Sequence, residues 1–346
     1  MQTILPGRIA AALAIATVSA IFASSATAAV HTMIVTSDPQ YPWTDATDAG
    51  RPQPDDVRNA RSRALIEEQY RSIAAYRAAR PGEDIPVFIN GDLTAYGHGW
   101  QRDVMEELYR ILGDNVHLGL GNHDYQNNIR QPNGSGCANN GCARDSIWGL
   151  VSHVAAKPGK VSFDFSIDAR GLGNRYKGSL AYAAQTPGMD RVLQVQLNNY
   201  PRYAVSFDTT EGILPARFDI DPSVPWLRTL LDRHLAIPTY GTPADRAYDF
   251  ALVHMHDASD YDDEFEQTIA SGHVAAVFAG HYHGTLGRFR TMAGVPVFLS
   301  GSASQRSYLI VEHDTESRHL RVYAVRDNDP SRKTLVDTVP AGTAGR

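Results

Sequence analysis

The sequence of 346 residues has only two cysteines, no excess of basic residues, and no apolar run as long as the ~20 residues that a membrane-spanning helix needs. Its 32 Lys and Arg against 38 Asp and Glu give a formal net charge of −6, so electrostatics provides no reason to expect a stable nucleic-acid complex. With 43% apolar and 20% charged residues, the composition excludes a multispanning membrane protein and a disordered chain. Thirteen histidines indicate site chemistry based on imidazole rather than thiolate.

The first 28 residues have the pattern of a cleaved export signal. Arg8 precedes the apolar run 9–23, and Ala26-Thr27-Ala28 has the A-x-A arrangement that a signal peptidase accepts. Cleavage there would leave a secreted or periplasmic protein without a transmembrane span. An uncleaved anchor is the alternative.

Export would place the two cysteines in an oxidising compartment. Cys137 and Cys142 lie in a Gly- and Asn-rich segment that is typical of a loop. We therefore expect a short-loop disulfide between them.

Strand-like and helix-like segments alternate in the first half of the chain. Strands are predicted at 30–36, 85–90 and 116–120, with helices at 55–80 and 104–112 between them. This order predicts a parallel βαβ core. Further segments are predicted as strands at 161–167, 192–197, 203–207, 250–254, 274–278, 295–300, 308–311 and 320–325, and as a helix at 226–235. We expect one α/β domain over 29–326, with a loop-rich insert near 126–160 and a loosely held tail at 327–346.

Polar clusters occur where several of these strands end. They are Asp38-Pro39-Gln40, Gly91-Asp92, Gly121-Asn122-His123-Asp124, His254-Met255-His256 and Gly280-His281-Tyr282-His283. The carboxyl ends of parallel strands lie along one edge of a sheet, where ligands bind, so these clusters are expected to converge.

The residue types in these clusters are metal ligands. Carboxylates with neutral imidazoles suit divalent first-row metals. The set is larger than one tetrahedral zinc requires and suffices for two ions ~3.5–4 Å apart that share a carboxylate. His254 and His256 lie on the same side of their strand, so either could be a ligand. We favour His256 because it is closer to the strand end.

The ordered set of motifs, over about residues 30–325, resembles the calcineurin-like metallophosphoesterases, a superfamily that includes purple acid phosphatases and acid sphingomyelinase. The resemblance implies an α/β fold built as a four-layer αββα sandwich, with a binuclear site at the carboxyl ends of the strands. It implies one metal held by Asp38, Gln40, Asp92 and His283, and a second held by Asp92, Asn122, His256 and His281. The ions would be Mn, Zn or Fe. His123 would contact the substrate phosphate or the leaving oxygen, with Asp124 orienting its imidazole.

Two positions depart from the family pattern. The family usually has His where this chain has Gln40, whose carbonyl oxygen is a harder and weaker donor. We expect the first metal to bind more weakly there, or the site to favour an oxygen-preferring ion such as Mn²⁺. The other departure is Ala95, where relatives usually have Asp or Tyr, so a tyrosinate ligand of the purple type is not expected.

These features predict an exported phosphoester hydrolase. Two metal ions would neutralise the phosphoryl oxygens and lower the pKa of bound water towards ~7, so that hydroxide can attack. The substrate would be a small-molecule, lipid or nucleotide phosphoester. A diester is favoured because aromatic residues follow the motifs, namely Tyr41, Trp43, Tyr96, Trp100, Tyr125 and Tyr282, together with His98. The alternatives are a phosphomonoesterase of the same fold and a non-catalytic binding protein on a decayed site.

Overall fold

The structure is a computed structural model that describes residues 29–130, 137–189, 191–235 and 248–341. The predicted export signal at 1–28 and the last five residues lie outside the described residues. In the described part of the chain, no helix combines the length and the apolar character needed to cross a bilayer.

A six-stranded sheet is built around the first predicted strand. Its order is β17-β16-β15-β1-β2-β3, and β1, β2 and β3 run parallel, as the βαβ pattern predicts. The strands are β1 (Val30–Thr36), β2 (Val87–Ile89), β3 (Val116–Leu118), β15 (Tyr308–Asp314), β16 (His319–Val325) and β17 (Thr334–Pro340).

A seven-stranded sheet packs against the first. Its order is β13-β14-β12-β11-β8-β7-β4, and its four central strands β14, β12, β11 and β8 are parallel. The strands are β4 (Lys160–Phe163), β7 (Tyr182–Gln185), β8 (Val192–Gln196), β11 (Phe250–His254), β12 (Val274–Ala279), β13 (Leu286–Met292) and β14 (Val295–Ser300).

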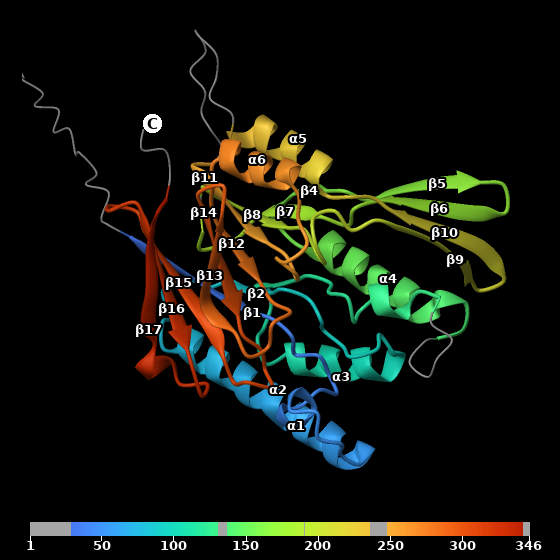
Figure 1. The fold of residues 1–346 in the computed structure, drawn as a ribbon, viewed down its shortest axis with the longest axis horizontal. Coiled ribbons are helices and arrows are strands. Elements are labelled where there is room, and N and C mark those ends of the chain that lie inside the picture. Colours follow the sequence, from blue (N-terminus) through green and yellow to red (C-terminus); the bar gives the residue numbers. More distant parts are fainter. Residues whose placement is uncertain (1–28, 131–136, 190, 236–247, 342–346) are drawn as a thin grey trace, which may run out of the picture.

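Helices cover the outer face of each sheet, which gives the four-layer αββα arrangement (Figure 1). The helices are α1 (Asp45–Asp48), α2 (Asp55–Ala78), α3 (Gly99–Tyr109), α4 (Gly141–Ala156), α5 (Val224–Leu235) and α6 (Asp263–Ser271). On α2, Ile66, Tyr70 and Ile73 are fully buried at helical spacing against the six-stranded sheet. Leu227 and Leu231 of α5 pack in the same way on the seven-stranded sheet. The predicted sandwich is confirmed.

Two predicted segments differ from the structure. The expected loop-rich insert at 126–160 contains α4, whose Ile147, Leu150 and Val154 are buried. The Gly- and Asn-rich segment before α4 hid this helix. The tail at 327–346 is not loosely held through most of its length, because β17 pairs antiparallel with β16. Among the residues of β17 only Val339 is well buried, so the apolar alternation that predicts strands is weak there.

A third sheet was not predicted. Its order is β5-β6-β10-β9, and it extends beside α4 away from the sandwich (Figure 1). The strands are β5 (Ser166–Arg170), β6 (Gly173–Gly178), β9 (Val205–Glu211) and β10 (Leu214–Ile220). Tyr176, Phe207 and Phe218 from these strands share an apolar cluster with Ile147 and Leu150 of α4.

Candidate metal centre

The predicted ligands other than His254 lie in loops that follow the parallel strands. Four of them have left-handed backbone conformations: Asp38 at φ 50°, Gln40 at 43°, Asp92 at 49° and His281 at 70°. Such a conformation costs a non-glycine residue about 1–3 kcal/mol and persists where the surrounding structure enforces it, typically at functional sites. The strained backbone therefore marks the same edge of the fold as the motifs.

Close packing of the loops on one another enforces this geometry. The Asp38 N–H donates to the Gly91 carbonyl at 3.1 Å, and the Gln40 N–H donates to the Asp92 carbonyl at 2.8 Å. A Cβ at Gly121 would lie 2.2 Å from Asp92 Oδ1, and a Cβ at Gly280 would lie 2.6 Å from Asp38 Oδ2. Glycine is therefore required at these two positions, because any side chain would occupy the space of a ligand.

Asp92, Asn122, His256 and His281 converge from the ends of four strands, β2, β3, β11 and β12. His256 Nε2 lies 3.2 Å from Asp92 Oδ2 and 3.0 Å from Asn122 Oδ1. His281 Nδ1 lies 3.3 Å from His256 Nε2. Ligand atoms of Asp92, His256 and His281 are all within 4.8 Å of one another. His256 Nδ1 donates to the Asn90 carbonyl at 2.9 Å, which fixes the ring with Nε2 toward the cluster.

A second group lies beside this cluster and contains Asp38, Gln40 and His283. His283 Nε2 is 3.3 Å from Asp38 Oδ1, and the His281 N–H donates to Asp38 Oδ2 at 3.0 Å. The amide oxygen of Gln40 is buried and has no hydrogen-bond partner. A buried acceptor without a partner costs about 1–3 kcal/mol, and a bound cation would remove that cost. The donor set of both groups, carboxylates, amide oxygens and imidazoles, therefore fits two metal ions.

The buried charges of the cluster depend on one another. Burial alone would lower the pKa of His256, but the charges of Asp92 and Asp38 outweigh it and raise this pKa to about 10. Burial also works against protonation of His283, but Asp38 and Asp48 raise its pKa to about 10. Burial would raise the pKa of Asp92, but His256 lowers it to about 2. Without cations, protonated imidazoles therefore compensate the buried carboxylates.

This balance predicts that metal binding releases protons. Because the pKa values of His256 and His283 are raised, both rings are protonated at pH 7 and must lose a proton to bind a metal. We expect release of about two protons per chain at pH 7, and metal affinity that increases as the pH rises towards 10. Calorimetric titration in buffers of different ionisation enthalpy measures the number released. Release of no protons at pH 7 would contradict the assignment of these rings as ligands.

His254 is not part of the site. Its Nε2 is 3.0 Å from Gln194 Oε1, and its ring stacks on Phe88 at a centroid distance of 4.1 Å, between the two sheets. Burial lowers the pKa of His254 to about 3, so the ring is neutral. The favoured His256 lies beyond the end of β11, where the chain turns toward the other ligands, while His254 is still within the strand. The inclusion of His254 among the ligands was therefore wrong.

His123 lies next to Asp92, as the resemblance implies, but Asp124 does not orient its ring. The His123 N–H donates to Asp92 Oδ1 at 2.9 Å, and His123 Nδ1 lies 2.9 Å from the Ala95 carbonyl. The Asp124 carboxylate instead accepts from the backbone N–H groups of Leu93, Thr94 and Gly121. The predicted role of Asp124 was wrong: Asp124 holds the loop that carries Asp92, and a backbone carbonyl leaves His123 Nε2 free.

Asp48 was missed by the sequence analysis. Its Oδ1 accepts from His283 Nδ1 at 2.6 Å and from Trp43 Nε1 at 2.7 Å. Its Oδ2 accepts from Ser304 Oγ at 2.5 Å and Gln305 Nε2 at 2.7 Å. Burial opposes ionisation, but the contact with His283 prevails and lowers the pKa of Asp48 to about 2. No local pattern connects Asp48 with His283, which is 235 residues away.

Asp48→Asn tests this supporting contact. A carboxylate behind a ligating histidine fixes its ring and increases its basicity, and its loss typically lowers metal affinity 10–100-fold. We expect a decrease of about that size, measured by competition with a chromogenic chelator. Asp45→Asn on the same short helix is the matched control, because Asp45 pairs with Arg61 instead. Equal affinity of the two variants would exclude this role for Asp48.

Gln40→His tests the departure from the family pattern. An imidazole is a stronger donor than an amide oxygen to Zn²⁺. We therefore expect the variant to bind the zinc ion at the site of Asp38 and His283 about tenfold more tightly, equivalent to about 1.4 kcal/mol. Zinc titrations of the wild type and the variant that coincide would show that residue 40 is not a ligand.

Two of the aromatic residues that follow the motifs contact the histidines. The Trp43 ring lies edge-on to His123 and His283, at centroid distances of 5.5 and 5.9 Å. Tyr282, with 38% of its surface exposed, packs edge-on against His281. Tyr125 is buried in another apolar cluster, and Tyr41 packs against Trp100. Tyr96 neighbours His98. Only Trp43 and Tyr282 of the predicted set are thus placed to contact a substrate at the histidines.

Comparison with known proteins identifies the family and the fold. A family model described as calcineurin-like phosphoesterase matches residues 31–285. A search of curated proteins found no match. Purple acid phosphatase PPD1 from yellow lupin has a similar fold, with 11% identity and a TM-score of 0.52 over 90% of this chain and 54% of that one.

Two further structures are more weakly similar. Sulfate thiohydrolase SoxB from Thermus thermophilus has 12% identity and a TM-score of 0.47, over 88% of this chain and 58% of that one. The calcineurin-like phosphoesterase YfkN from Bacillus subtilis has 13% identity and a TM-score of 0.42, over 91% of each chain. The chain thus spans little more than half the length of the lupin and Thermus proteins.

Proposed function

The chain belongs to the calcineurin-like phosphoesterase family, and we propose that it is a hydrolase that cleaves a phosphodiester at two bound metal ions. The observation that carries this proposal is the convergence of Asp92, Asn122, His256 and His281 beside Asp38, Gln40 and His283. When bound, two divalent ions would neutralise the phosphoryl oxygens and lower the pKa of a water ligand. Because Asp92 contacts His256 in one group and the backbone of Gln40 in the other, Asp92 would be the shared ligand.

His123 is the residue that we assign to proton transfer. Its Nδ1 is held by the Ala95 carbonyl, so Nε2 is the ring atom available to a substrate. Protonated at Nε2, His123 would donate to the oxygen of the departing alcohol. General acid catalysis of this kind contributes typically 10²–10⁴-fold.

Trp43 and Tyr282 support the preference for a diester. Both flank the histidines, and Tyr282 is partly exposed. Aromatic side chains bind apolar or planar groups well, and the second esterified group of a diester would lie against them. A phosphomonoester has no such second group.

A chromogenic screen distinguishes the candidate functions. Bis-p-nitrophenyl phosphate and p-nitrophenyl phosphate are compared with the metal-free protein reconstituted with Mn²⁺, Zn²⁺ or Fe²⁺. We expect two metal ions per chain and faster turnover of the diester. Faster turnover of the monoester would instead indicate a phosphatase. Metal binding without turnover of either ester would indicate a non-catalytic binding protein.

We also propose that the protein is exported. The A-x-A pattern at residues 26–28 and the disulfide between Cys137 and Cys142 support this location. Amino-terminal sequencing of the protein recovered from its native cell tests it. We expect a mature chain that begins at Ala29, and an intact Met1 would contradict the proposal.

A further inference from the structure

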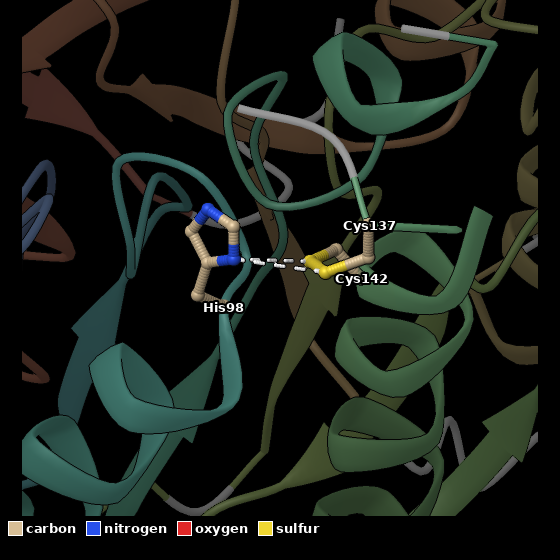
Figure 2. A group of neighbouring side chains, drawn as sticks. All are labelled: His98, Cys137 and Cys142. Carbon is tan, nitrogen blue, oxygen red and sulfur yellow. Dashed lines mark hydrogen bonds between the residues drawn. A yellow bond between two sulfur atoms is a disulfide. The ribbon is translucent and has the colours of Figure 1, made fainter. Parts of the chain in front are cut away.

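Another group of side chains that could bind a metal ion lies at the N-terminal ends of α3 and α4. It shares no residue with the cluster of Asp92, Asn122, His256 and His281 (the Asp92 cluster) or with the neighbouring group of Asp38, Gln40 and His283. It consists of His98, Cys137 and Cys142 (Figure 2). The two cysteines form a disulfide, and Figure 2 shows Nδ1 of His98 pointing at it. Nδ1 is 3.6 Å from Sγ of each cysteine. The imidazole therefore faces both sulfur atoms equally.

We propose that reduction of this disulfide produces a zinc site, with the two thiolates and His98 Nδ1 as three of its four ligands. In tetrahedral zinc sites, Zn–S bonds of about 2.3 Å and Zn–N bonds of about 2.0–2.1 Å place nitrogen and sulfur ligands about 3.6 Å apart. The nitrogen–sulfur separations of this group already have that value. Only the two sulfurs have to move, to about 3.8 Å from each other, by rotation of their side chains.

Reduction of the Cys137–Cys142 disulfide requires a reductant, which we take to be a dithiol. The dithiol transfers two electrons and two protons to the disulfide, which becomes two thiols while the reductant becomes a disulfide. Binding of Zn²⁺ then releases the two thiol protons, because only thiolates ligate the metal. Oxidation and metal binding therefore exclude each other at this group.

Contacts other than the disulfide hold the backbone at His98 and at the start of α4. His98 directly precedes α3, and its N–H donates to Oε1 of the buried Gln101 at 3.3 Å. Cys142 is the second residue of α4, and a helix start favours a thiolate. Arg102 of α3 pairs with Asp145 of α4 at 3.3 Å. These contacts would keep His98 near the cysteines after the sulfur–sulfur bond is broken.

Titration with Co²⁺ as the probe tests the proposal on the full protein. Thiolate ligands produce a sulfur-to-cobalt charge-transfer band, which the carboxylate and imidazole ligands of the Asp92 cluster do not. Protein reduced by a dithiol and freed of reductant under anaerobic conditions should develop this band as cobalt is added, with one thiolate-bound cobalt ion per chain at saturation. The oxidised protein should not develop it.

Variants assign the ligands. Cys142→Ser leaves only the Cys137 thiolate and should weaken the band. His98→Ala should lower the cobalt affinity, measured by the band, by at least about tenfold. His98→Gln repeats the second test with a larger side chain, and His319→Ala is the control for a histidine remote from the group. Circular dichroism checks that each variant is folded. Absence of the band in the reduced wild type, or equal affinity in folded His98→Ala or His98→Gln, would overturn the proposal.

Discussion

Asp92→Asn is expected to abolish hydrolysis and to prevent the binding of a second metal ion. Asp92 Oδ2 lies 3.2 Å from His256 Nε2, and the Asp92 backbone carbonyl accepts the Gln40 N–H at 2.8 Å, so Asp92 adjoins both groups of ligands. An amide has one metal-binding oxygen and no charge, and it cannot bridge two cations as a carboxylate does. Measurement of bound metal together with turnover of bis-p-nitrophenyl phosphate checks both parts of this prediction.

The control for Asp92→Asn is the same substitution at Asp103, an exposed residue of α3. It removes the same charge from the chain and should retain two metal ions and full turnover. If the folded Asp92→Asn protein binds two metal ions with wild-type affinity, the Asp92 carboxylate is not shared by the two ions.

His123→Ala is expected to lower turnover about 10²–10⁴-fold and to leave metal binding unchanged. His123 contacts Asp92 through its backbone N–H, which alanine retains. The His123 ring is held by the Ala95 carbonyl, which is not one of the predicted metal ligands. Removal of the ring therefore eliminates a proton donor without removing a metal ligand. Turnover and metal content of the same preparations separate the two effects.

The leaving group provides the sharper test of His123. An alkyl ester has a poor leaving group and depends on proton donation more than an ester of p-nitrophenol does. The loss of turnover in His123→Ala should therefore be larger for the alkyl ester. His123→Gln should behave like His123→Ala, because glutamine does not transfer a proton. A near-normal rate of His123→Ala on an ester with a poor leaving group would refute the role in proton transfer.

The parts of the fold that were predictable from sequence have strong local signals. The buried strand Val30–Thr36 is β-branched and apolar, and α2 carries Ile66, Tyr70 and Ile73 at helical spacing. The edge strand Thr334–Pro340 depends instead on backbone pairing with β16, and its sequence has no clear alternation. Elements defined by their partners were therefore missed.

The same distinction applies to the site. The ligands follow predictable strands in short motifs, so their convergence could be inferred from the order of the strands. Asp48 and the Ala95 carbonyl support His283 and His123 through contacts that only the folded chain creates. The carbonyl is a backbone group, which no residue type could have indicated. His254 and His256 share a strand face in the sequence pattern and were separated only by the end of β11.

The crystal structure of the Mn²⁺-loaded protein, with the ions located by anomalous scattering, tests the binuclear site most directly. We predict two anomalous peaks about 3.5–4 Å apart, with Asp92 coordinated to both. Histidines 256 and 281 should contact one ion, and His283 the other. A single ion, or two ions that do not share Asp92, would contradict the account.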